Sequence, residues 1–134
     1  LAWLTEEGAE LAACIADFYA SRLEPLDVGS ASSPLTIRHI VPPDEFATGL
    51  LYEGVEDNPW TNFVAQRSLE FAAEAARAAG GAAFNASVVA RWEALAARVV
   101  IPQDTHTGVF PEYGVPRFPE ANKWFGGWVK QADS

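Results

Sequence analysis

Apolar residues recur at helical spacing in three parts of the chain. In the first part, residues 5–24, Leu11, Ile15 and Phe18 lie three or four positions apart. Acidic residues occupy the first turn and a basic residue the last, as the helix dipole favours. Pro25 cannot continue a helix. The pattern therefore predicts a helix over residues 5–24 that ends at this proline and is followed by a polar loop.

The second helical segment has the clearest start signal in the chain. Asn58 is a favourable N-cap residue, and Pro59 suits the first helical position because its missing N–H would have no partner there. The pair Gly80-Gly81 marks the end of the segment. The stripe predicted to face the core, which Arg67 interrupts, consists of Trp60, Val64, Arg67/Ser68, Phe71 and Ala75.

A third helix is predicted over residues 86–99, with Asn85 or Ser87 as its cap. Its core side comprises Val89, Trp92, Leu95, Ala96 and Val99. Before the second helix, residues 36–41 alternate and predict a short extended run that places Ile37, His39 and Val41 on one side. A proline-rich loop covers residues 102–124. We predict an all-α fold with long connecting loops.

Composition narrows the classes of function. The 134 residues are 49% hydrophobic with mean hydropathy +0.00, which is typical of a globular domain with a real core. A net charge of −9 without a basic stripe argues against nucleic-acid binding. No apolar run approaches the roughly 20 residues of a membrane span. The chain begins at Leu1 and contains no methionine, which indicates a processed chain or a fragment.

The residue types that bind metals or cofactors are sparse. A single cysteine, Cys14, excludes an internal disulfide and a thiolate metal site, and its apolar helical setting predicts a small buried hydrophobe. His39 and His106 are too isolated to form a metal pair. There is no glycine-rich phosphate loop. The sequence predicts neither a metal site nor a cofactor.

The turn at residues 41–46, Val-Pro-Pro-Asp-Glu-Phe, is the best candidate for chemistry. Its two prolines stiffen the backbone and aim the side chains that follow. The apolar neighbours of Glu45 would raise its pKa, because an apolar setting disfavours the charged carboxylate, and so keep it protonated as a general acid. Taken alone, a solvated Pro-Asp turn is the better interpretation.

Three segments, taken together and in this order along the chain, favour a catalytic role for the turn instead. Residues 43–46 (Pro-Asp-Glu-Phe), 57–62 (Asp-Asn-Pro-Trp-Thr-Asn) and 130–133 (Lys-Gln-Ala-Asp) resemble motifs of the central catalytic region of glycoside hydrolase family 65. That family contains acid trehalases, the glucosidase acting on glucosyl-galactosyl-hydroxylysine of collagen, and disaccharide phosphorylases. The resemblance spans nearly the whole chain. It implies that residues 1–134 are part of an (α/α)6 barrel, a fold that needs far more chain than this.

The resemblance also implies roles for individual residues. Glu45 matches the general acid of inverting α-glucoside cleavage, and Lys130 and Gln131 match a pair that contacts the glucosyl unit. Asn62 matches a residue of the helix-opening motif, for which substrate contact and local capping hydrogen bonds are both open interpretations. Trp60 is a candidate sugar-stacking wall, although its place on the predicted apolar stripe favours core packing.

Two departures bear on the leaving-group site. Phe46 stands where the family usually has Tyr, and Ala47 where His is common. The catalytic base, or the phosphate-binding loop of a phosphorylase, lies C-terminal to the Lys-Gln motif in this family. The residues therefore leave hydrolysis and phosphorolysis open.

The resemblance predicts a trehalase-like or collagen-glucosidase-like glycosidase that acts on a small carbohydrate and is inactive as this isolated piece. A rival from another class is a non-catalytic helical interaction module. If the chain is a barrel fragment, Phe18, Phe71 and Trp92 should present apolar surface to helices outside it.

Overall fold

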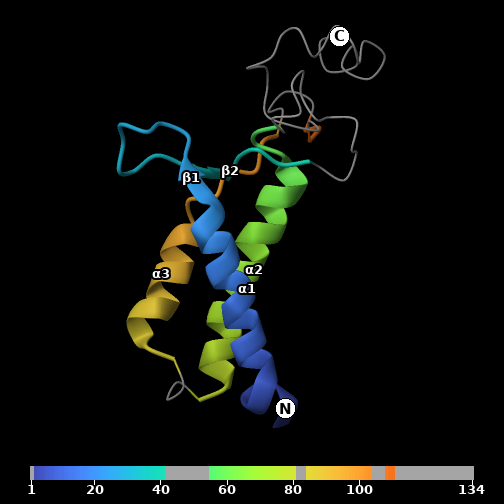
Figure 1. Ribbon diagram of the computed structural model, residues 1–134, viewed down its shortest axis with the longest axis vertical. Helices are drawn as coiled ribbons and strands as arrows, with labels where there is room; N and C mark the ends of the chain where they lie inside the picture. The colour runs from blue at the N-terminus through green and yellow to red at the C-terminus, as the bar shows by residue number, and fades with distance from the viewer. Residues whose placement is uncertain (1, 42–54, 81–83, 104–107, 111–134) are drawn as a thin grey trace, which may run out of the picture.

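The computed structural model describes residues 2–41, 55–80, 84–103 and 108–110. Three α-helices, α1 (Ala9–Arg22), α2 (Pro59–Ala78) and α3 (Ala86–Ala96), run alongside one another (Figure 1). Helix α2 packs against both of the others, whereas α1 and α3 touch only slightly. The described part of the chain is therefore mostly helical, as the sequence predicts.

Helix α1 is shorter than the predicted 5–24. A π-helical turn, η1 (Leu4–Gly8), precedes it, and Leu23 leaves the helix with extended backbone angles (φ −73°, ψ 128°). Strand β1 (Leu23–Pro25) then pairs antiparallel with strand β2 (Leu35–Ile37). The helix thus ends before Pro25 because these residues pair with β2.

The predicted start of α2 is confirmed. Asn58 is the N-cap, and its side-chain oxygen accepts hydrogen bonds from the Thr61 backbone N–H (2.8 Å) and hydroxyl (2.9 Å). Pro59 is the first helical residue. The helix ends before Gly80, whose φ of +95° lies in the left-handed region that glycine adopts at little cost. Local sequence signals determine both ends.

Helix α3 is capped by Asn85, as predicted, and its predicted core side is largely confirmed. Trp92, Ala96 and Val99 are buried, and Val89 and Leu95 pack partly buried against the core. The Trp92 indole N–H donates to Asp17 of α1 (2.9 Å), which ties the two helices together. The helix ends at Ala96 rather than residue 99, because Val99 forms a parallel bridge with Leu35 of β2.

The core between the helices is made mostly of alanine. Its buried members are Ala9, Ala12, Ala16, Leu69, Ala72, Ala75, Ala76, Trp92, Ala96 and Val99. Small side chains let helix backbones approach closely, so the alanine faces of α1 and α2 meet. Leu69 of α2 is also buried, but most other large apolar residues of these two helices are exposed.

The stripes predicted to be the core faces of α1 and α2 are therefore wrong. Leu11, Ile15 and Phe18 of α1 are exposed, as are Trp60 and Phe71 of α2. The residue spacing shows an apolar stripe on each helix. The close contact between the helices, however, buries the alanines beside that stripe. Of the second stripe, Ala75 is buried.

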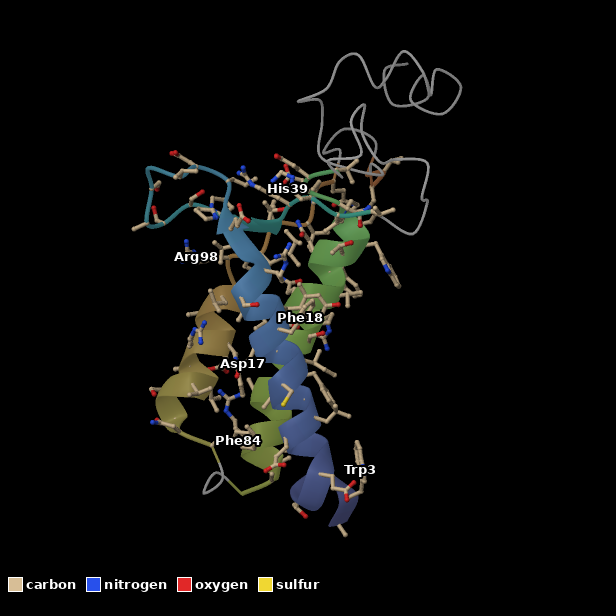
Figure 2. The ribbon with its side chains drawn as sticks, viewed as in Figure 1. Trp3, Asp17, Phe18, His39, Phe84 and Arg98 are labelled. Carbon is tan, nitrogen blue, oxygen red and sulfur yellow. The ribbon has the colours of Figure 1, made fainter. Side chains whose placement is uncertain are left out.

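Two expectations about individual side chains are corrected by the same packing. Cys14 is exposed rather than buried, because it lies on the outer side of α1. Phe18 and Phe71 are 59% and 53% exposed, as the fragment hypothesis expects, but Trp92 is only 1% exposed. Phe18 appears on the surface of α1 in Figure 2.

The extended run at residues 36–41 is only partly as predicted. Ile37 is buried in β2, but His39 has a φ of 55° and both His39 and Val41 are exposed. The left-handed backbone at His39 interrupts the alternation. The run therefore divides into β2 and a separate bridge at Ile40.

Candidate active site

Two of the residues assigned by motif, Trp60 and Asn62, lie in the first turns of α2. Glu45, Lys130 and Gln131 are outside the described residues. The start of α2 and strands β1 and β2 lie together at the end of the bundle opposite the N-terminus (Figure 1).

The two segments that flank residues 42–54 are paired with each other. Ile40 N–H donates to the Val55 carbonyl (3.2 Å), and Val55 N–H donates to the Ile40 carbonyl (2.8 Å). We call residues 38–41 and 55–57 the neck. This bridge holds the residues just before and just after segment 42–54 next to each other, directly before α2.

Arg38 is the first residue of the neck, and its side chain is only 14% exposed. It forms ion pairs at 3.9 Å with Glu24 and with Glu56, and its guanidinium donates to the backbone carbonyls of Pro25 (3.1 Å) and Leu26 (3.2 Å). The arginine therefore joins the neck to β1 and to Leu26, which follows it. Sequence reasoning missed this role.

The backbone of the neck is strained on both sides of the bridge. His39 and Asp57 have φ values of 55° and 58°, a region that non-glycine residues seldom adopt. Asp57 Oδ1 and Arg38 Nε are buried without a hydrogen-bond partner among the described residues. Such features persist only where the surrounding structure holds them, and they gather at functional sites. His39 is placed at this end in Figure 2.

Asn62 does not contact solvent in the structure, because its exposed fraction is 0%. Its side-chain N–H groups donate to the Thr36 hydroxyl and to the Val100 carbonyl, both at 2.9 Å. Its side-chain oxygen accepts from the Ile37 backbone N–H (3.1 Å). Asn62 thus lies beneath the surface, and its side-chain polar atoms are bonded to distant parts of the chain rather than to local capping groups.

Trp60 is on the surface, 59% exposed, so the core-packing interpretation is wrong for it. Its ring lies 6.5 Å from that of Phe63, which is also exposed, at 45%. The two rings form an aromatic surface on the first turns of α2, on the helix that follows the neck. An exposed indole face is the type of surface on which sugar rings stack.

Another group of charged residues lies away from this end. A shallow groove between α2 and α3 carries the ion pairs Arg67–Glu70 and Arg77–Glu93, which are largely solvent-exposed and contribute little to stability. Among the described residues, no group of His, Cys, Asp and Glu is arranged to hold a metal ion. No helix there has the length and apolar character needed to cross a membrane.

Comparison with known proteins agrees with the motifs. Residues 1–124 match the family described as glycosyl hydrolase family 65 central catalytic domain. The protein-glucosylgalactosylhydroxylysine glucosidase of Danio rerio is 35% identical over 94% of this chain, and that of Gallus gallus is 36% identical over 81%. The kojibiose hydrolase of Mucilaginibacter mallensis is 31% identical over 98%. The chain spans only 14–16% of the length of these relatives.

Proposed function

Because this chain belongs to glycosyl hydrolase family 65, we propose that it forms part of the catalytic domain of an enzyme that hydrolyses α-glucosides, with Glu45 as the general acid. The observation that carries the proposal is the Ile40–Val55 bridge. It pairs the two ends of the segment that contains Glu45, next to the start of α2. A proton donor needs a fixed approach to the leaving oxygen, and a paired neck supplies a firm base for that approach.

The proposed reaction proceeds with inversion. Glu45 gives its proton to the glycosidic oxygen as the bond from that oxygen to the anomeric carbon breaks. A water molecule attacks the opposite face of the anomeric carbon and loses its proton to a second carboxylate, about 6.5–9.5 Å from the acid. We assign that second carboxylate to a part of the polypeptide beyond these residues.

Three further residues are assigned to the sugar. Lys130 and Gln131 would hold hydroxyl groups of the glucosyl unit, since lysine donates and glutamine both donates and accepts. Trp60 would stack against a sugar ring, and its exposed indole supports this role. These residues fit a small neutral carbohydrate as the substrate.

The experiment for Glu45 uses the full-length protein. Glu45→Gln should lower turnover of kojibiose, trehalose or a glucosyl-galactosyl-hydroxylysine peptide by about 10²-fold or more, because proton transfer in the transition state is lost. Asp44→Asn is the matched control, since it removes the neighbouring carboxylate and should cost much less. A Glu45→Gln enzyme within about tenfold of the parent would contradict the assignment.

Phosphorolysis is the rival within the enzyme class, because it uses the same acid with phosphate in place of water. The relatives named above are glucosidases and hydrolases, which favours hydrolysis. Product analysis decides between the two reactions. Free glucose formed without phosphate supports hydrolysis, and β-glucose 1-phosphate formed only with added phosphate supports phosphorolysis.

The helices are proposed to belong to a larger (α/α)6 barrel. The exposed Phe18 and Phe71 support this, because a self-contained module would not be expected to leave such residues on its outer helix faces. The isolated 134 residues should therefore associate through these faces and release no glucose from disaccharides. A stable, active monomer of residues 1–134 would contradict this proposal, and a stable, inactive monomer would favour the interaction module.

A further inference from the structure

Asn62 joins three segments that are far apart in the sequence. Its side chain bonds to Thr36 and Ile37, about 25 residues earlier, and to Val100, 38 residues later. Both side-chain N–H groups and the side-chain oxygen are used, and the residue is fully buried. Asn62 is therefore a cross-brace between β2, the first turn of α2 and the chain that leaves α3.

The bonds of Asn62 are not needed to start the helix. Asn58 already caps α2 by accepting from the Thr61 N–H and hydroxyl. On the same edge of β2, Leu35 N–H donates to the Arg98 carbonyl (2.7 Å) and Val100 N–H donates to the Leu35 carbonyl (2.9 Å). Asn62 thus completes the attachment of β2 to the helices from within the protein.

The bonded residue Ile37 lies three positions before Ile40, at which the neck closes. Between them, Arg38 is held by its carbonyl and carboxylate contacts and His39 by a left-handed backbone. A shift of β2 relative to α2 would therefore move the neck as a unit. The hydrogen bonds of Asn62 oppose that shift because they are directional and shielded from water.

We propose that Asn62 is a positioning residue for the general acid. It holds the neck, which precedes and follows the segment containing Glu45 in the chain, in place against α2, and it does so without touching the substrate. This inference rests on the proposed function. Proton donation requires heavy atoms about 2.6–3.2 Å apart, so a small displacement of the neck lowers the rate of proton transfer more than it weakens sugar binding.

Substrates with different leaving groups can show whether the general acid has been displaced. The alkoxide of a disaccharide is a poor leaving group and needs the proton of the acid as the glycosidic bond breaks. In α-glucosyl fluoride, fluoride departs with the bonding electron pair and depends far less on that proton. Misplacing the acid should therefore slow disaccharide hydrolysis selectively, with kcat affected and KM nearly unchanged.

The experiment compares two substitutions in the full-length enzyme. Asn62→Ala should lower kcat on kojibiose or trehalose by about tenfold or more, but on α-glucosyl fluoride by less than about threefold. Thr36→Val removes one hydrogen-bond acceptor of the Asn62 side chain with almost no change of shape. It should also lower kcat more on the disaccharide than on α-glucosyl fluoride, but by a smaller factor. If Asn62→Ala does not fold, the Thr36 variant decides. Equal losses on both substrates in the variant that folds would overturn the inference.

Two controls separate the possible failures. Trp92→Phe removes a partly buried hydrogen bond to Asp17, which Figure 2 labels in the middle of the bundle, and should affect both substrates equally. Glu45→Gln should show the strongest selectivity. If it shows none, the general-acid assignment itself fails. If Glu45→Gln is selective and the Asn62 and Thr36 variants are not, only the positioning role is refuted.

Discussion

The middle of the helix bundle and its neck end are held together by different forces. In the middle, alanine faces of α1 and α2 meet, and the large side chains of Trp92 and Leu69 have almost no exposure. At the neck end, the contacts are polar and long-range: the Asn62 side chain, the Arg38 guanidinium and the Ile40–Val55 bridge. Apolar packing gives way to hydrogen bonds where the segment containing Glu45 departs.

The difference shows what each kind of contact accomplishes. Burial of alanine surface is non-directional, so it brings helices together without prescribing where a connecting segment points. Hydrogen bonds from a buried amide prescribe both distance and direction. A site that must aim a side chain is therefore expected to depend on the polar end, while overall stability depends on the middle. The following predictions test this contrast by local opening free energies from hydrogen exchange in the full-length protein.

The largest effect is expected in the middle of the bundle. Trp92→Ala should lower the opening free energy of α1 and α3 by about 3–5 kcal/mol, because it leaves a cavity and removes the partner of Asp17. Trp60→Ala is the matched control on an exposed tryptophan and should cost less than about 1 kcal/mol. Similar losses for both would contradict the assignment of the core.

Asn62→Leu should cost about 2–3 kcal/mol, since a side chain of similar size leaves the Ile37 N–H, the Thr36 hydroxyl and the Val100 carbonyl without their partner. The increase in exchange should be confined to β2, the neck and residues 97–103. If hydrogen exchange in α1 increased as much as in β2 and the neck, the middle of the bundle and the neck end would not be held together independently.

Ala16→Leu tests the close contact of α1 with α2. The residue is 0% exposed, so a larger side chain should push the helices apart at a cost of about 1–3 kcal/mol. A tolerated Ala16→Leu would show that the helix spacing is looser than the structure has it.

The smallest effect is expected at the helix caps. Asn58→Ala should cost about 1 kcal/mol by removing the acceptor of the Thr61 N–H and hydroxyl. Asn85→Ala removes the equivalent cap of α3, where the oxygen accepts from the Ser87 N–H and hydroxyl. Asn85→Ala, at an exposed site, should lower the opening free energy by no more than Asn58→Ala does at its buried site. A larger loss at Asn85 would contradict the role of burial.

The features that the sequence determined by itself are local ones. Asn58 and Pro59 specify where α2 begins, Gly80 where it ends, and Asn85 where α3 begins, because each acts on backbone groups within a few residues. The core side of α3 was also readable, since Trp92, Ala96 and Val99 form its apolar stripe. The motifs from which we propose roles for Glu45, Lys130 and Gln131 are likewise continuous in sequence.

Tertiary structure decided the rest. Spacing alone could not show that α1 and α2 turn their alanines inward and Phe18 and Phe71 outward, because both faces are apolar and the choice depends on how closely two helices approach. Nor could it show the role of Asn62, whose motif is compatible with a cap or a sugar ligand. Its hydrogen-bond partners are brought to it only when β2 and the chain after α3 converge on α2.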